Sequence, residues 1–170
     1  YRVAGQGEPI LLIHGFASSG QINWWDTNWV KTLVDAGRRV ITIDNRGHGF
    51  SEKLYDPTQY TATLMAEDAR RLLDHLGIAR CDVMGYSMGA RITAVLTLHH
   101  PERVGRVVFG GLASRMITGF SNSEAIVQGL EAETVAAVTD PVARAFRIFA
   151  DMTRSDRKAL AACMKSSRMK

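Results

Sequence analysis

Four short runs of apolar residues alternate with longer stretches of helical character along the first two thirds of the chain. The four runs are residues 9–14, 39–44, 80–85 and 104–110. The stretches between them are residues 24–36, 61–76 and 88–100. Gly37 and Gly77 follow the first two stretches where a C-terminal helix cap belongs, and Pro101 stops the third. This alternation predicts an α/β fold with a parallel sheet, helices on both of its faces and right-handed crossovers.

The pattern changes at about residue 119, where strand-like runs give way to Ala-rich helical segments. These segments are residues 124–130, 134–138, 141–152 and 155–164. Phe146 and Phe149 share one stripe of the third segment, which suits core packing as well as a pocket wall. We therefore divide the chain into an α/β part, residues 1–120, and a helical part, residues 121–170.

A serine between two glycines stands where the third predicted strand meets the third predicted helix. The segment reads Gly85-Tyr86-Ser87-Met88-Gly89. At so tight a turn the serine side chain is pushed out of the backbone, and glycines are needed because neighbouring chains approach too closely for a Cβ. A chance G-x-S-x-G in a loop is the alternative, but the strand before and the helix after it favour a nucleophile elbow.

Two further segments suit the same design. The first strand ends in His14-Gly15-Phe16, a loop that can turn the Phe16 N–H toward the serine. With the Met88 N–H it would form a two-donor oxyanion hole. The second strand is followed by residues 44–51, DNRGHGFS, whose glycines suit a tight turn. Within that turn we expect Asp44 and Arg46 to form a local structural ion pair rather than a catalytic one.

With these three segments in this order and spacing, the chain resembles the α/β-hydrolase superfamily over about residues 1–120, and residues 100–104, HPERV, follow as they often do there. The resemblance implies a partial α/β-hydrolase fold followed by a helical lid-like segment over residues 121–170. It implies that Ser87 is the nucleophile and that Phe16 and Met88 are the backbone oxyanion donors. Surface helices packed on the core remain the alternative for the last segment.

The acid and the base of such a site cannot be found in the chain. By resemblance both follow the serine, yet the histidines are His14, His48, His75, His99 and His100, with none later. The last two lie at the far end of the helix that begins beside the serine, roughly 18 Å away at ~1.5 Å per residue. For the others we expect a loop-packing imidazole, a turn residue and a helix C-terminal residue, in that order.

The position after the fourth strand, another place for the family's acid, supplies no carboxylate over residues 111–114. We therefore expect the chain to be an N-terminal piece of the hydrolase fold. Both ends agree with this expectation, because residues 1–5 read as the tail of a strand already under way and residues 165–170 as a basic end without a closing element.

The composition excludes several classes of function. With 46% hydrophobic residues, 22% charged residues and a net charge of +4, the chain is globular and does not suit nucleic-acid binding; its basic stretch, residues 154–170, reads as a solvated, frayed end. No targeting or membrane-spanning segment is evident. Cys81 and Cys163 suggest reduced thiols and a cytoplasmic protein. No dinucleotide loop, P-loop or metal-ligand spacing indicates a cofactor.

The leading hypothesis is a cofactor-independent serine hydrolase that acts on a small ester, lactone or activated ketone through an acyl-enzyme at Ser87. The alternative is a non-catalytic, truncated hydrolase-fold protein that serves as an interaction scaffold. We expect the sheet order 39–44, 9–14, 80–85, 104–110, which leaves the last strand at an edge. An exposed apolar edge favours a homo-oligomer, formed through that edge or the helical tail.

Overall fold

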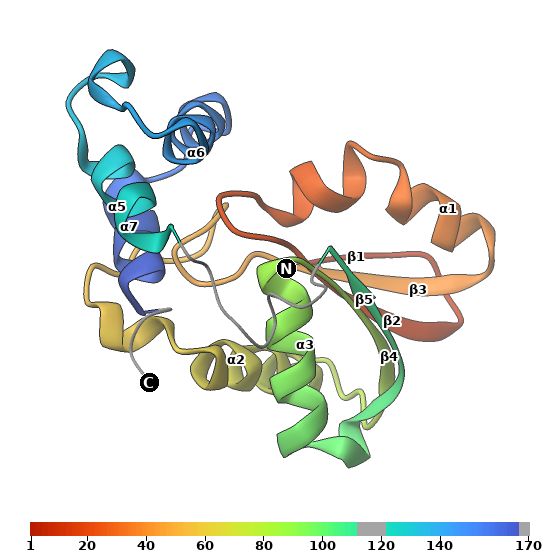
Figure 1. The fold of residues 1–170 in the computed structure, drawn as a ribbon. Helices are drawn as coiled ribbons and strands as arrows, with labels where there is room; N and C mark the ends of the chain where they lie inside the picture. The colour runs from red at the N-terminus through yellow and green to blue at the C-terminus, as the bar shows by residue number, and fades with distance from the viewer. Residues whose placement is uncertain (112–121, 167–170) are drawn as a thin grey trace.

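The computed structural model describes residues 1–111 and 122–166 (Figure 1). These residues form a sheet of five strands in the order β1-β3-β2-β4-β5. The strands are β1 (Arg2–Ala4), β2 (Glu8–Ile13), β3 (Arg38–Ile43), β4 (Cys81–Tyr86) and β5 (Val104–Gly110). β1 runs antiparallel to β3, and the other neighbouring pairs are parallel. The four predicted strands and their order are confirmed, and β1 is the strand whose tail was expected over residues 1–5.

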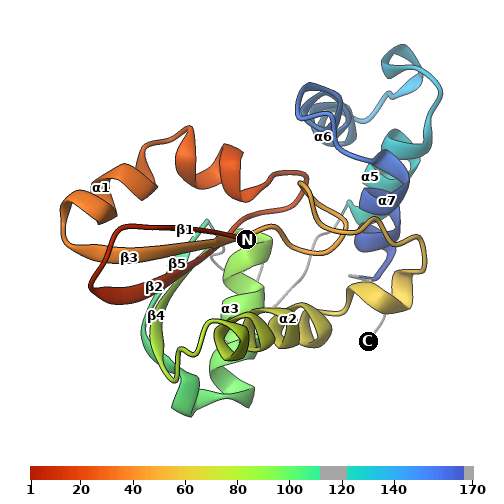
Figure 2. The same ribbon diagram turned by 180° about the vertical axis from the view of Figure 1, so that it is seen from behind.

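Alternate residues of the central strand β2 point to opposite faces of the sheet, and each face has its own apolar layer. The helices that cover the faces are α1 (Trp29–Asp35), α2 (Ala62–His75) and α3 (Met88–His99). Leu11 and Ile13 pack with α2 and α3. Ile10 and Leu12 pack with α1. Figures 1 and 2 show the sheet between α1 on one side and α2 with α3 on the other, so the predicted layers are confirmed.

The single helix expected over residues 24–36 is wrong. The segment forms a short π-helical turn, η1 (Gln21–Trp25), and then α1. Between them Asn28 has φ +64°, in the left-handed region. Asn adopts this conformation more readily than most residues because its short polar side chain can bond locally. The break allows Trp24, which is 2% exposed, to pack on the sheet.

Four helical elements lie in residues 122–166, and we call them together the cap. They are α5 (Ser123–Glu131), η4 (Val135–Ala137), α6 (Pro141–Met152) and α7 (Arg157–Ser166). All four helical segments predicted from the sequence are therefore confirmed. Figures 1 and 2 show α5, α6 and α7 gathered at one end of the molecule. The cap shares one apolar cluster with Phe16, Ala17 and Tyr60 of the α/β part. The proposed division at residues 120 and 121 lies outside the described residues.

The expectation of a frayed, solvated end is wrong for residues 157–166. Leu160, Cys163 and Met164 of α7 are all buried. They are covered because α7 packs against α5 and against the short helix η2 (Pro57–Tyr60) of the α/β part. No helix in the described residues is long and apolar enough to cross a bilayer.

β5 lies at the edge of the described sheet and pairs there with β4. Val108 and Phe109 of this strand are 50% and 46% exposed. The predicted edge position is thus confirmed. The homo-oligomer expected from it stays a prediction.

Candidate active site

Ser87 lies at the turn between β4 and α3, in a backbone conformation that non-glycine residues rarely adopt. Its φ is +53° and its ψ is −115°. Such strain costs of order 1–3 kcal/mol and persists only where the surroundings fix the backbone. Here the Ser87 N–H donates to the Gly110 carbonyl at 2.8 Å, and the Ser87 carbonyl accepts from Ala90 N–H at 3.0 Å. The predicted strand–serine–helix turn is confirmed.

The two glycines that flank the serine sit where neighbouring backbone leaves no space. A Cβ on Gly89 would lie 2.6 Å from the carbonyl carbon of Ile13 and 2.7 Å from the carbonyl oxygen of His14. A Cβ on Gly85 would clash with the Gly89 carbonyl and the Thr93 hydroxyl. The first turn of α3 therefore rests directly on the carboxyl end of β2, which confirms the physical reason given for these glycines.

The loop after β2 reaches the same place. A Cβ on Gly15 would lie 3.3 Å from Ser87 Cβ and 3.3 Å from the Tyr86 carbonyl oxygen, so the loop touches the serine. The Gly15 N–H donates to Asn23 Oδ1 at 2.9 Å, which ties the loop to η1. Phe16 follows Gly15, and Met88 follows Ser87. The structure thus brings the residues of both expected oxyanion donors beside the serine, while their role as donors stays a prediction.

His14 is fully buried and holds this loop through both ring nitrogens. The Asn45 N–H donates to His14 Nε2 at 3.0 Å, so Nε2 carries no proton and Nδ1 donates to the Gly15 carbonyl at 2.7 Å. Asn45 Nδ2 in turn donates to the His14 carbonyl at 3.1 Å. Burial lowers the pKa of His14 to about 4. The ring is a neutral structural group, as the sequence led us to expect.

His48 is buried beside it. The two imidazole centroids are 5.3 Å apart, and Phe16 meets the His48 ring edge-on at 5.8 Å. His48 Nδ1 donates to the Arg46 carbonyl at 2.9 Å, which leaves Nε2 unprotonated and without a partner among the described residues. Burial, with a smaller contribution from His14, lowers the pKa of His48 to about 3. Two neutral imidazoles therefore lie under the loop.

The remaining histidines lie at other places in the fold. His75 Nε2 bonds to the Tyr1 hydroxyl at 3.1 Å, and His100 pairs with Glu67. His99 is exposed at the end of α3. All five histidines belong to the described residues, and none of them forms a hydrogen bond with the Ser87 side chain.

The prediction of an ion pair between Asp44 and Arg46 is wrong. Arg46 instead pairs with Asp68 of α2 through Nε and Nη2, both at 2.7 Å, and this partner raises the pKa of the guanidinium. Asp44 accepts the Gly20 N–H at 2.7 Å and the Phe50 N–H at 2.9 Å. The carboxylate thus joins two loops at the carboxyl edge of the sheet, where backbone donors need a partner.

Sequence reasoning missed the part that Asn45 plays in holding the loop under Ser87. A usable signal existed, because β2 and β3 are parallel neighbours and residues that follow them meet at the same edge of the sheet. No group of three or more His, Cys, Asp or Glu side chains in residues 1–111 and 122–166 is placed to hold a metal ion.

The sequence that forms the turn at Ser87 and the loop beside it matches a known protein family. A family model described as the alpha/beta hydrolase fold matches residues 8–153. The chain belongs to the α/β-hydrolase family. The predicted family and fold class are therefore confirmed.

Individual relatives agree with this assignment. A 2-hydroxymuconate semialdehyde hydrolase from Pseudomonas sp. (strain CF600) is 37% identical over 110 residues, which cover 65% of this chain and 38% of the relative. An sn-1-specific diacylglycerol lipase from Danio rerio is 31% identical over 129 residues, 75% of this chain and 38% of the lipase. The chain thus spans less than two fifths of the length of either curated relative.

Solved structures show the same fold. A hydrolase from Pseudomonas aeruginosa superposes with a TM-score of 0.73 at 26% identity, over 99% of this chain and 67% of that one. Epoxide hydrolase A from Mycobacterium thermoresistibile matches with a TM-score of 0.59 at 30% identity, over 63% of this chain and 33% of that one. The first match extends over the cap as well as the sheet, since it covers nearly the whole chain.

Proposed function

We propose that this chain carries the nucleophile and the oxyanion hole of a serine hydrolase. The observation that supports it best is the backbone of Ser87, strained at φ +53° between two glycines at which an added Cβ would clash with neighbouring backbone. Strain of this kind clusters at functional sites, where it holds a side chain in a fixed, exposed position. The family assignment supports the same reading.

In the proposed reaction the Ser87 Oγ attacks the carbonyl carbon of the substrate, and its proton passes to a general base. The negative charge that develops on the carbonyl oxygen is stabilised by the N–H groups of Phe16 and Met88, and by the N-terminus of α3. Collapse of this intermediate expels the leaving group, which takes the proton, and leaves an acyl group on Ser87. Water then releases the acid and restores the serine.

The base is proposed to come from sequence outside these 170 residues, together with its acid. Both histidines near the loop are buried, with pKa values of about 4 and 3, and His14 already uses both nitrogens. Removal of triad members costs on the order of 10⁴-fold or more in kcat in well-studied serine hydrolases. The 170-residue chain alone should therefore be nearly inactive.

We propose a substrate with an electrophilic carbonyl: a small ester, a lactone or an activated ketone. The similar proteins include a semialdehyde hydrolase and a diacylglycerol lipase, whose names support a hydrolase that acts on a carbonyl compound or an ester; an epoxide hydrolase is also among them. The same α/β scaffold hosts many chemistries, so the fold alone does not identify the substrate. The proposal therefore depends on Ser87 and the residues around it.

Labelling with a serine-directed fluorophosphonate tests the proposal in the full-length protein that contains this chain. Ser87 should be the modified residue, identified by peptide mass, and Ser87→Ala should abolish both labelling and the hydrolysis of short acyl esters. Ser51→Ala is the matched control, because this serine donates from Oγ to the Asp44 carbonyl at 2.6 Å. Labelling that persists in Ser87→Ala would refute the assignment of the nucleophile.

A second candidate is a hydrolase-fold scaffold without catalysis. The observation that favours it is that no histidine in the chain bonds to Ser87, and both nearby imidazoles are neutral and buried. The two functions predict opposite results in the same assay. A full-length protein that neither reacts with the fluorophosphonate nor hydrolyses esters would support the scaffold.

We also propose a cytoplasmic location. Both cysteines are free and buried, and burial raises the pKa of Cys81 to about 11 and that of Cys163 to about 12. Thiols held protonated in this way are unreactive, which suits a protein whose cysteines stay reduced. Fractionation of the source cells, with antibodies against the chain, tests this location.

A further inference from the structure

The side chains of both expected oxyanion residues are packed against the cap. Phe16 and Ala17 belong to the apolar cluster formed by α5, α6 and α7, and Met88 packs against the same cluster. An oxyanion hole works only if its N–H donors are fixed before the charge develops. Whatever holds these two residues therefore affects the geometry of the hole.

Helix α6 contacts the loop at two places. The Phe146 ring meets Phe16 edge-on, with centroids 5.7 Å apart, and Phe16 is packed from another side by His48. At the end of the helix, Thr153 Oγ1 lies 3.2 Å from the Ala17 carbonyl and can donate to it. Ala17 has φ +57°, so this carbonyl belongs to a strained residue that needs support.

Helix α7 of the cap contacts Met88. Cys163 Sγ of α7 lies 3.9 Å from Met88 Sδ, and Cys163 is buried. Through α6 and α7 the cap thus touches the residue of each proposed donor. On the cap side of these contacts, Phe146, Thr153 and Cys163 are not among the residues proposed to meet the substrate carbonyl.

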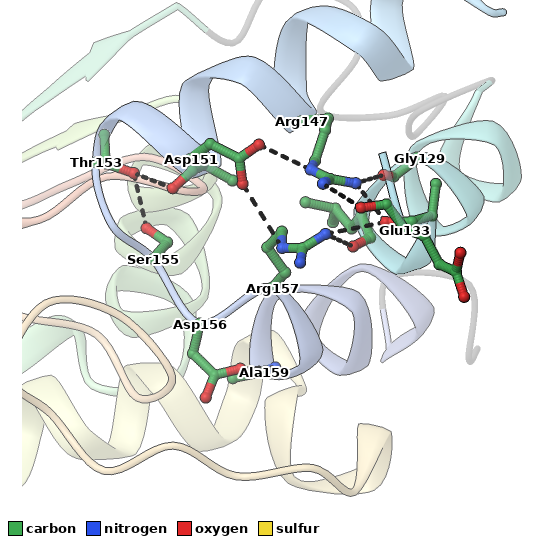
Figure 3. Close-up of polar contacts among 12 residues, drawn as sticks. Gly129, Glu133, Arg147, Asp151, Thr153, Ser155, Asp156, Arg157 and Ala159 are labelled. Carbon is green, nitrogen blue, oxygen red and sulfur yellow. Dashed lines mark hydrogen bonds and ion pairs between the residues drawn. The ribbon is translucent and has the colours of Figure 1, made fainter. Parts of the chain in front are cut away.

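Hydrogen bonds and ion pairs join the helices of the cap to one another (Figure 3). Arg147 is 4% exposed and donates to the Gly129 carbonyl at 3.1 Å and to the Ala132 carbonyl at 2.5 Å, which ties α6 to α5. Arg147 also pairs with Asp151 at 2.9 Å, one turn further along α6.

The end of α6 is fixed in the same way. Arg157, at the start of α7, lies 3.6 Å from Asp151 and donates to the Ala132 carbonyl at 3.0 Å. Thr153 and Ser155 bond to each other at 2.8 Å in the connection between the helices, as Figure 3 shows. Thr153 Oγ1 also lies 3.2 Å from the Ala150 carbonyl of α6, so the hydroxyl that faces Ala17 has two further partners within the cap.

We propose that Phe146 and Thr153 are positioning residues, through which the cap fixes the oxyanion loop of residues 14–17. This inference rests on the proposed function, since it assigns to the cap a part in catalysis by Ser87. A cap that moves as a unit would carry both contacts with it, so its position sets the placement of the Phe16 N–H. A misplacement of 1 Å at a reacting centre can cost about 10²-fold in rate.

Two variants of the full-length protein test the inference. Thr153→Val removes the hydroxyl and keeps the shape, and Phe146→Leu removes the ring edge. Each should lower the rate of fluorophosphonate labelling of Ser87, and kcat for a short ester, about tenfold, with KM within twofold. Thr153→Ser should restore the rate. Met152→Ala is the control, because Met152 lies on the same helix and is 76% exposed.

Amide hydrogen exchange over residues 14–18 supplies a readout that needs no activity. Faster exchange in Thr153→Val and Phe146→Leu, at unchanged thermal unfolding temperature, would support the inference. Exchange and labelling equal to those of the wild type in both folded variants would overturn it. If wild-type Ser87 is not labelled at all, the proposed function fails and the catalytic part of the inference fails with it. Unchanged exchange would then show separately that the cap does not hold the loop.

Discussion

Gly89→Ala tests whether the elbow depends on the close approach of α3 to β2. The new Cβ would lie 2.6 Å from the Ile13 carbonyl carbon, 2.7 Å from the His14 carbonyl oxygen and closer still to the Ile13 oxygen. Side-chain carbons stay at least 3.0 Å from such atoms, so helix and strand must separate by more than the 0.4 Å that the Ile13 carbonyl carbon alone requires, because the Ile13 oxygen is closer. All three atoms are backbone, so no flexible side chain can move aside.

The expected cost follows from this geometry. Overpacking of a well-packed interior costs typically about 1–3 kcal/mol, and the rigid surroundings put Gly89→Ala at about 3 kcal/mol. For a chain of this size that lowers the unfolding temperature by roughly 6–12 °C. The labelling rate of Ser87 should fall more than stability alone explains, because the shift also separates the serine from the loop at Gly15.

Calorimetry and fluorophosphonate labelling measure the two effects. Gly77→Ala is the control: Gly77 follows the C-terminus of α2, has φ +65°, and a Cβ added there would meet no atom within 4 Å. It should cost only the backbone strain of a left-handed alanine, about 1–2 kcal/mol, and leave labelling unchanged. A Gly89→Ala protein as stable and as reactive as the wild type would refute the close-packing argument.

Three further outcomes are expected. The pKa values of His14 and His48, about 4 and 3, lie below the ordinary value of 6.5, so the unfolded chain binds more protons than the folded chain. The free energy of unfolding should therefore fall as pH drops from about 6.5 toward 3. Urea unfolding at several pH values should show this slope, and His48→Gln should reduce it. Arg46→Lys cannot keep both bonds to Asp68 and should cost about 1 kcal/mol in urea unfolding, whereas loss of the exposed pair Lys31–Asp35 should cost less than about 0.5. The 170-residue chain should be a dimer or larger by light scattering, and Val108→Lys should shift it to monomer if β5 is the contact; a soluble wild-type monomer at tens of micromolar would contradict the proposed edge contact.

The features predicted correctly are those set by neighbours in the sequence. The elbow is specified by five consecutive residues, and the strands by short apolar runs. The sheet order was predicted from the resemblance. In the structure, parallel pairing places Ile13 beside both Ile43 and Gly85. The strand, the turn and the helix are consecutive in the sequence, so the turn at Ser87 could be predicted from it.

Two of the three errors concern contacts between distant residues. Arg46 pairs with Asp68, 22 positions away, instead of with its near neighbour Asp44. The basic end was read as frayed because its charges are visible in the sequence, while the partners that bury Leu160 and Cys163 are not. The helix over residues 24–36 is interrupted at Asn28, whose left-handed backbone no periodicity reveals. In the first two cases tertiary contacts overrode a local preference, whereas the break at Asn28 is a local feature of the backbone.

The position of Ser87 is maintained by segments that are far apart in the chain, which explains why a strained residue can be kept there. Gly110 of β5 accepts its N–H, the carboxyl end of β2 supports the first turn of α3, and the loop at Gly15 closes against its side chain. Each of these contacts is made by a segment outside the turn, so the energy that stabilises the strained turn comes from packing around it. The cap adds contacts to Phe16 and Met88 from α6 and α7. Relaxation of any one of these contacts would move Ser87 relative to Phe16 and Met88, so the roles proposed for these three residues depend on the stability of the packing around them.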